Sequence, residues 1–196
     1  MFRSKKYSLR YVLSTHKLLT FLVTHLFFLT ACSNIPPKSS SLSLKELRLI
    51  EHPPKSTLQK IDNLMPAALR WYKQVENSLY PKGRKLSGAE KKQAKQFGII
   101  NPDLIRVVIL EKFPEPNNKT VNNHFEGARA MGNVIMIKPQ HQNNSVVLCH
   151  ELVHIAQIDR LGLKQFLKRY AIEHEIVGYS RSLLENEAYA RQQIIQ

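Results

Sequence analysis

The residues best suited to chemistry lie in one short run, 149–157, which reads Cys-His-Glu-Leu-Val-His-Ile-Ala-Gln. If this run is helical, His150 and His154 stand one turn apart on the same face, where both imidazoles can reach one ion. Glu151 lies beside the pair, where a carboxylate can take a proton from a metal-bound water, and the H-E-x-x-H pattern is typical of zinc-dependent peptide hydrolysis. A catalytic zinc usually takes three protein ligands, so the rest of the chain must supply a third.

The residues around this run favour a buried helix with an inward polar stripe. Ser145 can cap its start, and Cys149 is interpreted as a small buried apolar residue. The apolar side chains that surround the polar ones are Val146, Val147, Leu148, Leu152, Val153, Ile155 and Ile158. The alternative is a surface helix that carries two incidental histidines.

Several downstream residues are candidates for the third ligand: Glu173, His174, Glu175, Glu185 and Glu187. A histidine six positions after His154 would mark the metzincin spacing, but that position holds Arg160, which excludes this subclass. The other subclass takes a glutamate from a later helix, so the stretch 184–190, Leu-Glu-Asn-Glu-Ala-Tyr-Ala, becomes informative.

Over residues 100–196 the chain resembles the gluzincin-type metallopeptidases, and among them small, mostly uncharacterised bacterial domains. The resemblance is carried by H-E-L-x-H-x-x-Q at 150–157, by Gly-Asn-Val-Ile at 132–135, and by E-x-E-A at 185–188. Membrane-embedded peptidases of the CaaX-processing kind share an E-x-x-A-D version of the last motif, in which the first glutamate binds zinc.

The resemblance implies a Zn²⁺ site formed by His150, His154 and Glu185. Glu187 is the less favoured third ligand, because helical residues two apart do not share a face. One departure stands out, since Tyr189 replaces the aspartate that steadies the first histidine in the related motif. Support for that histidine must therefore come from elsewhere.

The implied mechanism is hydrolysis of a peptide bond with Glu151 as general base on a zinc-bound water. A nearby donor would stabilise the oxyanion, and His174 and Tyr179 are the candidates, ahead of Tyr170 and Arg181. The alternative function is a catalytically idle, zinc-stabilised binding or scaffold lipoprotein of the cell envelope. A helix-rich structural lipoprotein without metal is a third possibility.

The N-terminal segment is interpreted as a signal peptide, 1–31. Five basic residues and no acidic one precede an apolar stretch, 18–31, that is too short to span a bilayer comfortably. It ends in Leu-Thr-Ala-Cys, which resembles the lipobox of bacterial lipoproteins and implies a lipid on Cys32. The implied location is the bacterial cell envelope, lipid-anchored, and Ser33 implies the outer membrane, facing the periplasm. The partners would be the membrane and a peptide or envelope-protein substrate.

Beyond the signal peptide the chain has 24 basic and 15 acidic side chains, a net charge of +9. This charge favours anionic surfaces, but no arginine-rich or aromatic-interleaved pattern indicates nucleic-acid binding. Residues 32–55, rich in serine and proline, are expected to be a tether with a short helix at 42–50. The remaining residues, 56–196, suffice for one core and are interpreted as one zincin-like domain.

The pattern of this domain predicts an α+β fold, mainly helical, with a small antiparallel sheet before the metal helix and a minimal zincin-like architecture. The expected helices begin at Ser56, with a kink or restart at Pro66, and at Ser87, Ser145, Gly162 and Ser180, the last one reaching 196. The expected strands are 104–110, 128–131 and 134–138, the last two joined at Gly132-Asn133. Strand 134–138 is expected to offer a free edge to an extended peptide.

Overall fold

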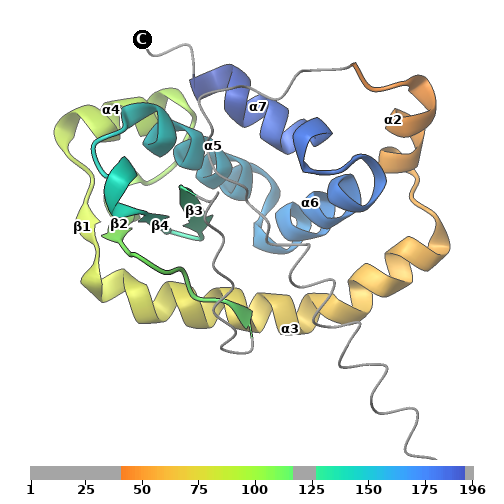
Figure 1. The fold of residues 1–196 in the computed structure, drawn as a ribbon, viewed down its shortest axis with the longest axis horizontal. Helices are drawn as coiled ribbons and strands as arrows, with labels where there is room; N and C mark the ends of the chain where they lie inside the picture. The colour runs from red at the N-terminus through yellow and green to blue at the C-terminus, as the bar shows by residue number, and fades with distance from the viewer. Residues whose placement is uncertain (1–40, 117–126, 193–196) are drawn as a thin grey trace, which may run out of the picture.

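The structure is a computed structural model that describes residues 41–116 and 127–192. The expected signal peptide and the lipidation at Cys32 lie outside these residues, as does the end of the last predicted helix, 193–196. The chain is mostly helical with one small sheet, so the predicted α+β class is confirmed. The elements in Figure 1 are α2 (Leu44–Glu51), α3 (Lys55–Leu79), β1 (Arg84–Lys85), α4 (Gly88–Gln96), β2 (Arg106–Ile109), β3 (Ala128–Met131), β4 (Val134–Ile137), α5 (Ser145–Leu161), α6 (Leu163–Val177) and α7 (Leu183–Gln192).

The sheet is mixed, with the strand order β1-β2-β4-β3. Strands β3 and β4 form the hairpin predicted at Gly132-Asn133, where Met131 pairs with Val134. Strand β4 also pairs with β2, in parallel, with Val134 opposite Arg106. The expected antiparallel sheet is therefore wrong for this pair, because the hairpin turns β4 back into the direction of β2.

The prediction that 134–138 offers a free edge is also wrong, because β2 and β3 occupy the two sides of β4. Strand β3 lies at the edge of the sheet, yet all four of its residues are at most 4% exposed. Neither strand of the hairpin therefore presents an open backbone edge to a peptide.

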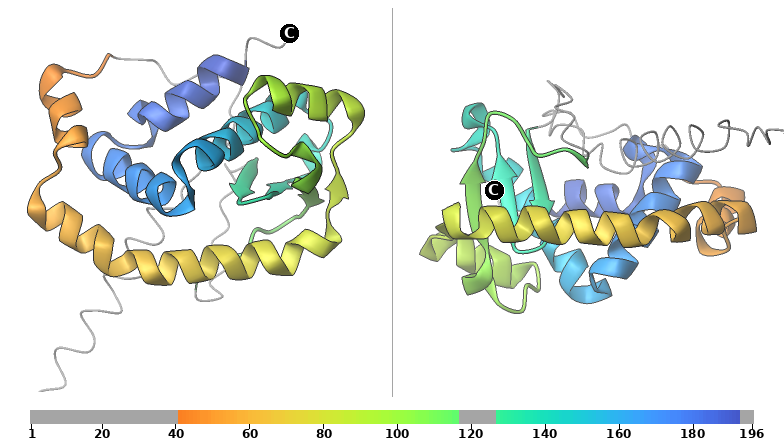
Figure 2. Two further views of the ribbon diagram at one scale, coloured as in Figure 1. Left: turned by 180° about the vertical axis from the view of Figure 1, so that it is seen from behind. Right: turned by 90° about the horizontal axis from the view of Figure 1, so that it is seen from below.

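Helix α3 runs along the whole molecule and supports both the sheet and α6 (Figure 2). Its buried side chains recur at three- and four-residue intervals, as expected of an amphipathic helix: Ile61, Met65, Ala68, Tyr72, Val75 and Leu79. Pro66 lies inside the helix without dividing it. Figure 1 shows that the helix bends between its orange N-terminal part and its yellow remainder, which matches the predicted kink.

Helix α5 is the central helix and carries the run 149–157. It packs against β3, β4, α4, α6 and α7, and every residue from Val147 to Gln157 is buried. The alternative of a surface helix is therefore wrong. The cap is Asn144 and not Ser145, because the Asn144 side chain accepts hydrogen bonds from the backbone N–H groups of Val146 and Val147, at 3.0 and 3.3 Å.

Helix α7 begins later than predicted. A 3₁₀ turn, Tyr179–Arg181, follows α6, and Leu183 is the first residue of α7. The predicted cap, Ser180, lies in that turn, whereas the carbonyl oxygen of Ser182 accepts the first helical hydrogen bond, from Asn186 N at 2.9 Å. The Ser182 hydroxyl also accepts from the backbone N–H of Glu185.

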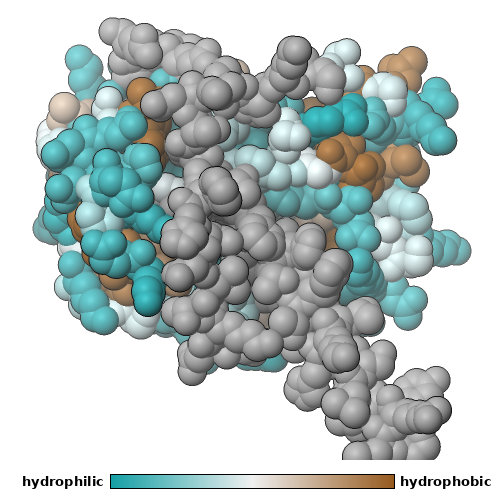
Figure 3. Space-filling model, viewed as in Figure 1, coloured by the Kyte–Doolittle hydropathy of each residue, from teal (hydrophilic) through white to brown (hydrophobic). Residues whose placement is uncertain are grey.

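Helix α2 lies within the expected tether, 32–55, and packs against α6. It is joined to the chain before α7 by a two-pronged ion pair, in which Arg181 donates to both carboxylate oxygens of Glu46 at 2.7 and 2.9 Å. In the described ranges, no helix combines the length and apolar character needed to cross a membrane. The described surface in Figure 3 is mainly hydrophilic, with small separate apolar groups.

Candidate metal site

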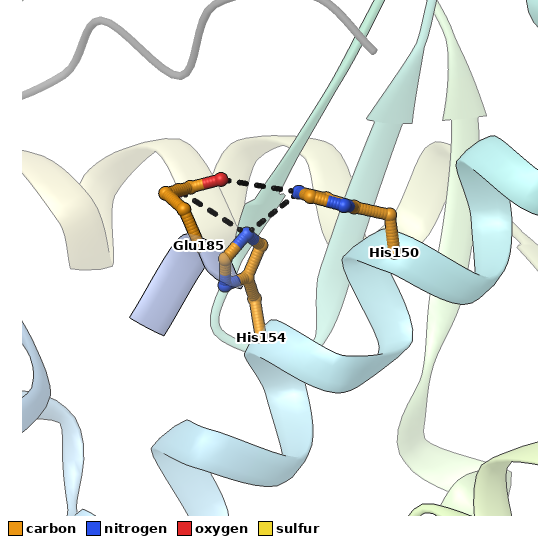
Figure 4. Close-up of side chains that lie close together, drawn as sticks. All are labelled: His150, His154 and Glu185. Atoms are coloured by element: carbon orange, nitrogen blue, oxygen red, sulfur yellow. Dashed lines mark hydrogen bonds and ion pairs between the residues drawn. The ribbon is translucent and has the colours of Figure 1, made fainter. Parts of the chain in front are cut away.

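Three buried side chains from two helices meet at one point. Helix α5 supplies His150 and His154, α7 supplies Glu185, and none of the three is more than 2% exposed (Figure 4). The two Nε2 atoms are 3.1 Å apart, and Glu185 places Oε2 3.3 Å from His150 Nε2 and Oε1 3.5 Å from His154 Nε2. Such a group of two imidazoles and one carboxylate could bind a metal ion.

The other acidic candidates are engaged elsewhere. Glu187 points away from the imidazoles and makes a two-pronged ion pair with Arg160, at 3.0 and 2.8 Å. Glu175 pairs with Lys60. Glu173 is buried, and its Oε2 accepts from the backbone N–H of Leu184 at 2.9 Å, so it caps the start of α7. Only Glu185 of these residues joins the two histidines.

Two glutamines support the histidines, and sequence reasoning assigned neither of them a role. His150 Nδ1 lies 2.8 Å from Gln192 Oε1, and His154 Nδ1 lies 2.9 Å from Gln157 Oε1, both within hydrogen-bond distance. Tyr189, which stands where the related motif has aspartate, packs its ring edge-on against His150 with 4.7 Å between the ring centres. A signal for Gln192 was present, because it follows Glu185 by seven residues and so lies on the same helical face.

Glu151 lies next to the two imidazoles and is 2% exposed. Its carboxylate contacts the backbone of Ala130 in β3, while its Oε2 has no hydrogen-bond partner among the described residues. Burial raises the pKa of Glu151, and the neighbouring Glu185 adds to that effect against the opposing pull of the histidines. A second oxygen without a hydrogen-bond partner in the described structure is Oε2 of Glu185.

The buried carboxylates near the imidazoles favour the positively charged form of His154. Burial is the largest effect on the pKa of His154 and would lower it, but the charge and hydrogen bond of Glu185, the charge of Glu151 and the hydrogen bond to Gln157 together raise that pKa to about 9. Burial alone would likewise raise the pKa of Glu185, yet the two imidazoles hold it well below its usual range. A bound cation can provide this charge in place of a proton.

Aromatic side chains line the site on the α6 side. The hydroxyl of Tyr170 donates to Glu185 Oε1 at 3.0 Å, and the ring of Tyr170 lies 4.1 Å from that of His174. His174 packs against Tyr179, whose hydroxyl lies 3.3 Å from that of Tyr189. The predicted donors His174 and Tyr179 thus contact Tyr170 and Tyr189, which in turn contact the candidate ligands Glu185 and His150.

Arg181, the other donor considered, is bound to Glu46 on α2 and does not point to the imidazoles. The site as a whole joins three candidate ligands to an adjacent buried carboxylate, an arrangement that can bind a cation and move a proton beside it. Comparison with known proteins found no matching family model, no matching curated protein and no matching solved structure.

Proposed function

We propose that this protein is a membrane-tethered, zinc-dependent peptidase of the gluzincin type, with Zn²⁺ held by His150, His154 and Glu185. The observation that carries the proposal is the meeting of the H-E-x-x-H helix α5 with a glutamate from a later helix at one buried point. The same helix presents Glu151 beside the cluster.

The spacing of the candidate ligands suits zinc. Tetrahedral zinc with bonds of about 2.0–2.1 Å holds its ligand atoms about 3.3–3.4 Å apart. The two Nε2 atoms are 3.1 Å apart, each histidine has a different Glu185 oxygen at 3.3 or 3.5 Å, and one donor atom from each residue lies within 4.8 Å of the others, so small side-chain shifts would bring them to this spacing. Two buried carboxylates, Glu151 and Glu185, also balance the charge of one divalent cation. The two carboxylate oxygens without hydrogen-bond partners in the described structure support the same fit.

Bound zinc would polarise the scissile carbonyl and make a water easier to deprotonate. Glu151 would take the proton from the attacking water as the new C–O bond forms, and would pass it to the leaving nitrogen as the C–N bond breaks. Its burial and raised pKa suit a group that both accepts and returns a proton. Tyr170 would hold the Glu185 carboxylate in place through its hydroxyl.

The membrane tether and the location are proposed from the sequence alone. The basic segment, the apolar stretch 18–31 and Cys32 support a lipid-anchored protein of the bacterial envelope, in the outer membrane and facing the periplasm. A peptide or an envelope protein would then be the substrate.

A second function, a catalytically idle zinc-stabilised binding or scaffold lipoprotein, is favoured by one observation. His150, Glu151, His154 and Glu185 are all at most 2% exposed, as in a metal site that stabilises a fold. The two functions share the metal and differ in the part played by Glu151.

Both functions require bound metal, and the metal content of the purified protein tests this requirement. We expect the purified full chain, loaded with zinc and dialysed, to retain about one zinc per molecule. His154→Ala and Glu185→Gln should lose that zinc, whereas Glu175→Gln, the same change at an exposed ion pair with Lys60, should keep it. Equal loss in Glu185→Gln and Glu175→Gln would contradict the ligand assignment.

Glu151→Gln then separates the two functions. The variant should keep zinc, because the residue is not a ligand, and should lose at least 100-fold in the hydrolysis of labelled casein or of a quenched peptide library. Hydrolysis at an undiminished rate would overturn the assignment of Glu151 as the base. A zinc-loaded wild-type protein that cleaves neither probe, and whose role in cells survives Glu151→Gln, would favour the scaffold.

A further inference from the structure

The amide of Gln157 has only one orientation that fits its neighbours. Its nitrogen donates to the carbonyl oxygen of Leu184 at 2.9 Å and to Glu187 Oε2 at 3.1 Å, and both of these atoms are acceptors only. The amide oxygen must therefore face His154, where it accepts from Nδ1 at 2.9 Å. With its proton on Nδ1, neutral His154 presents an unprotonated Nε2 to His150 and Glu185.

Gln192 does the same for the other histidine from the far end of α7. Its Oε1 lies 2.8 Å from His150 Nδ1, where it can accept the same hydrogen bond, and the residue is 8% exposed. Because Gln192 follows Glu185 by seven residues, one face of α7 supplies both a candidate ligand and a support for His150. Gln157 contacts the start of α7 and Gln192 lies at its end, so the two amides bracket the pairing of α5 with α7.

Gln157 and Gln192 are uncharged, although the residue that accepts a hydrogen bond from a metal-binding histidine is often a carboxylate. The pocket already contains the buried carboxylates of Glu151 and Glu185, whose two charges match one divalent cation. A third or fourth buried carboxylate would leave the loaded pocket with net negative charge and would have to be desolvated. An amide oxygen accepts the same hydrogen bond without that cost.

We propose that Gln157 and Gln192 are the positioning residues of the metal site, which hold both imidazoles with Nδ1 protonated and Nε2 free for the ion. Gln192, which contacts the first histidine, takes the part of the aspartate that Tyr189 replaces. This inference depends on the proposed metal site and not on the hydrolysis of any substrate.

Zinc affinity of the full chain, measured by competition with a chromogenic chelator, tests this role. Gln192→Leu and Gln157→Leu should each weaken zinc binding about 10–100-fold. Gln192→Glu restores an acceptor at the same place and should bind zinc at least as tightly as the wild type. Gln74→Leu, on an exposed position of α3, is the matched control and should leave the affinity unchanged.

The ring ¹⁵N shifts of the zinc-loaded protein provide a second measurement that a merely structural role would not change. Wild-type protein should show two histidines with protonated Nδ1 and metal-bound Nε2, and Gln192→Leu should alter the Nδ1 signal of His150 alone.

Unchanged zinc affinity in both leucine variants, or binding through Nδ1, would overturn the inference while leaving the peptidase proposal standing. Weakened affinity without any hydrolysis by the wild type would support the inference and count against the peptidase. A wild-type chain that binds no zinc would overturn both.

Discussion

Glu76 on α3 is joined to Asn133 in the turn between β3 and β4. Its Oε1 accepts from the backbone N–H of Asn133 at 2.8 Å and from the Asn133 side chain at 3.2 Å. The carboxylate lies so close to Gly132 that a Cβ at that position would collide with it. Helix α3 thus fixes the hairpin on which the metal helix packs.

Gly132→Ala is therefore expected to destabilise the protein by about 2–4 kcal/mol, from the collision and from the positive φ of 63°. Urea denaturation measures this change. Gly98→Ala is the matched control, because Gly98 has a φ of 85° and open space where a Cβ would lie, and it should cost only about 1 kcal/mol. Because Glu76→Ala also removes the hydrogen bonds to Asn133, its own cost is measured first; Gly132→Ala should then cost less in the Glu76→Ala background than in the wild type, and an equal cost in both would contradict the collision.

Glu173→Ala is expected to destabilise the protein by about 2–3 kcal/mol, because it leaves the buried Leu184 N–H and the Ser182 hydroxyl without their acceptor. Glu175→Ala, on the same helix, removes an exposed ion pair with Lys60 and should cost at most about 1 kcal/mol. Urea denaturation of both variants decides the matter. Similar losses would show that Glu173 does not cap α7.

Zinc is expected to raise the midpoint of thermal unfolding, because an ion held only by the folded chain stabilises it. The gain is about 2.7 kcal/mol at a free zinc concentration 100 times the dissociation constant. Calorimetry with and without a chelator measures the shift. His154→Ala should show no shift and Glu175→Gln a full one, and a shift retained in His154→Ala would indicate zinc bound elsewhere.

The ion pair between Glu46 and Arg181 predicts a pH dependence of stability. The Arg181 guanidinium and hydrogen bonds from Ser43 lower the pKa of Glu46 to about 2. A lowered carboxyl pKa stabilises the fold above the unfolded value of 4.5, and the contribution is lost as the pH falls from there toward 2. The stability difference between wild type and Glu46→Gln should thus be constant near neutral pH and shrink below about pH 4.5. Glu51→Gln on the same helix is the control, and a difference that grows on acidification would contradict the ion pair.

Local patterns were enough to predict helix α5 and the meeting of its two histidines. The four-residue spacing of His150 and His154 places both on one face wherever the helix lies, whereas Glu185 was favoured over Glu187 through the resemblance to the E-x-x-A-D motif. The capping box at Ser87 and Glu90 was equally local, since both of its hydrogen bonds join residues three apart. These predictions needed no knowledge of the packing.

Predictions that depended on packing or on a choice between similar residues were less accurate. Asn144 and Ser145 can both cap a helix, as can Ser180 and Ser182, and only the path of the chain decides between them. The parallel pairing of β2 with β4 joins segments separated by the loop and by β3, so no turn signal marks it. The seven-residue spacing places Gln192 on the same helical face as Glu185, but its contact with His150 also requires α7 to lie along α5, which no single-helix pattern reveals.

The candidate ligands are far apart in the sequence, and this has a consequence for how the site is made. During synthesis the histidine pair is complete at His154, but Glu185 and Gln192 follow only after 31 and 38 further residues. Two of the three candidate ligands are therefore synthesised well before the third. We expect a fragment cut between α5 and α7 to keep both histidines and, because it lacks Glu185, to bind zinc more weakly than the full chain.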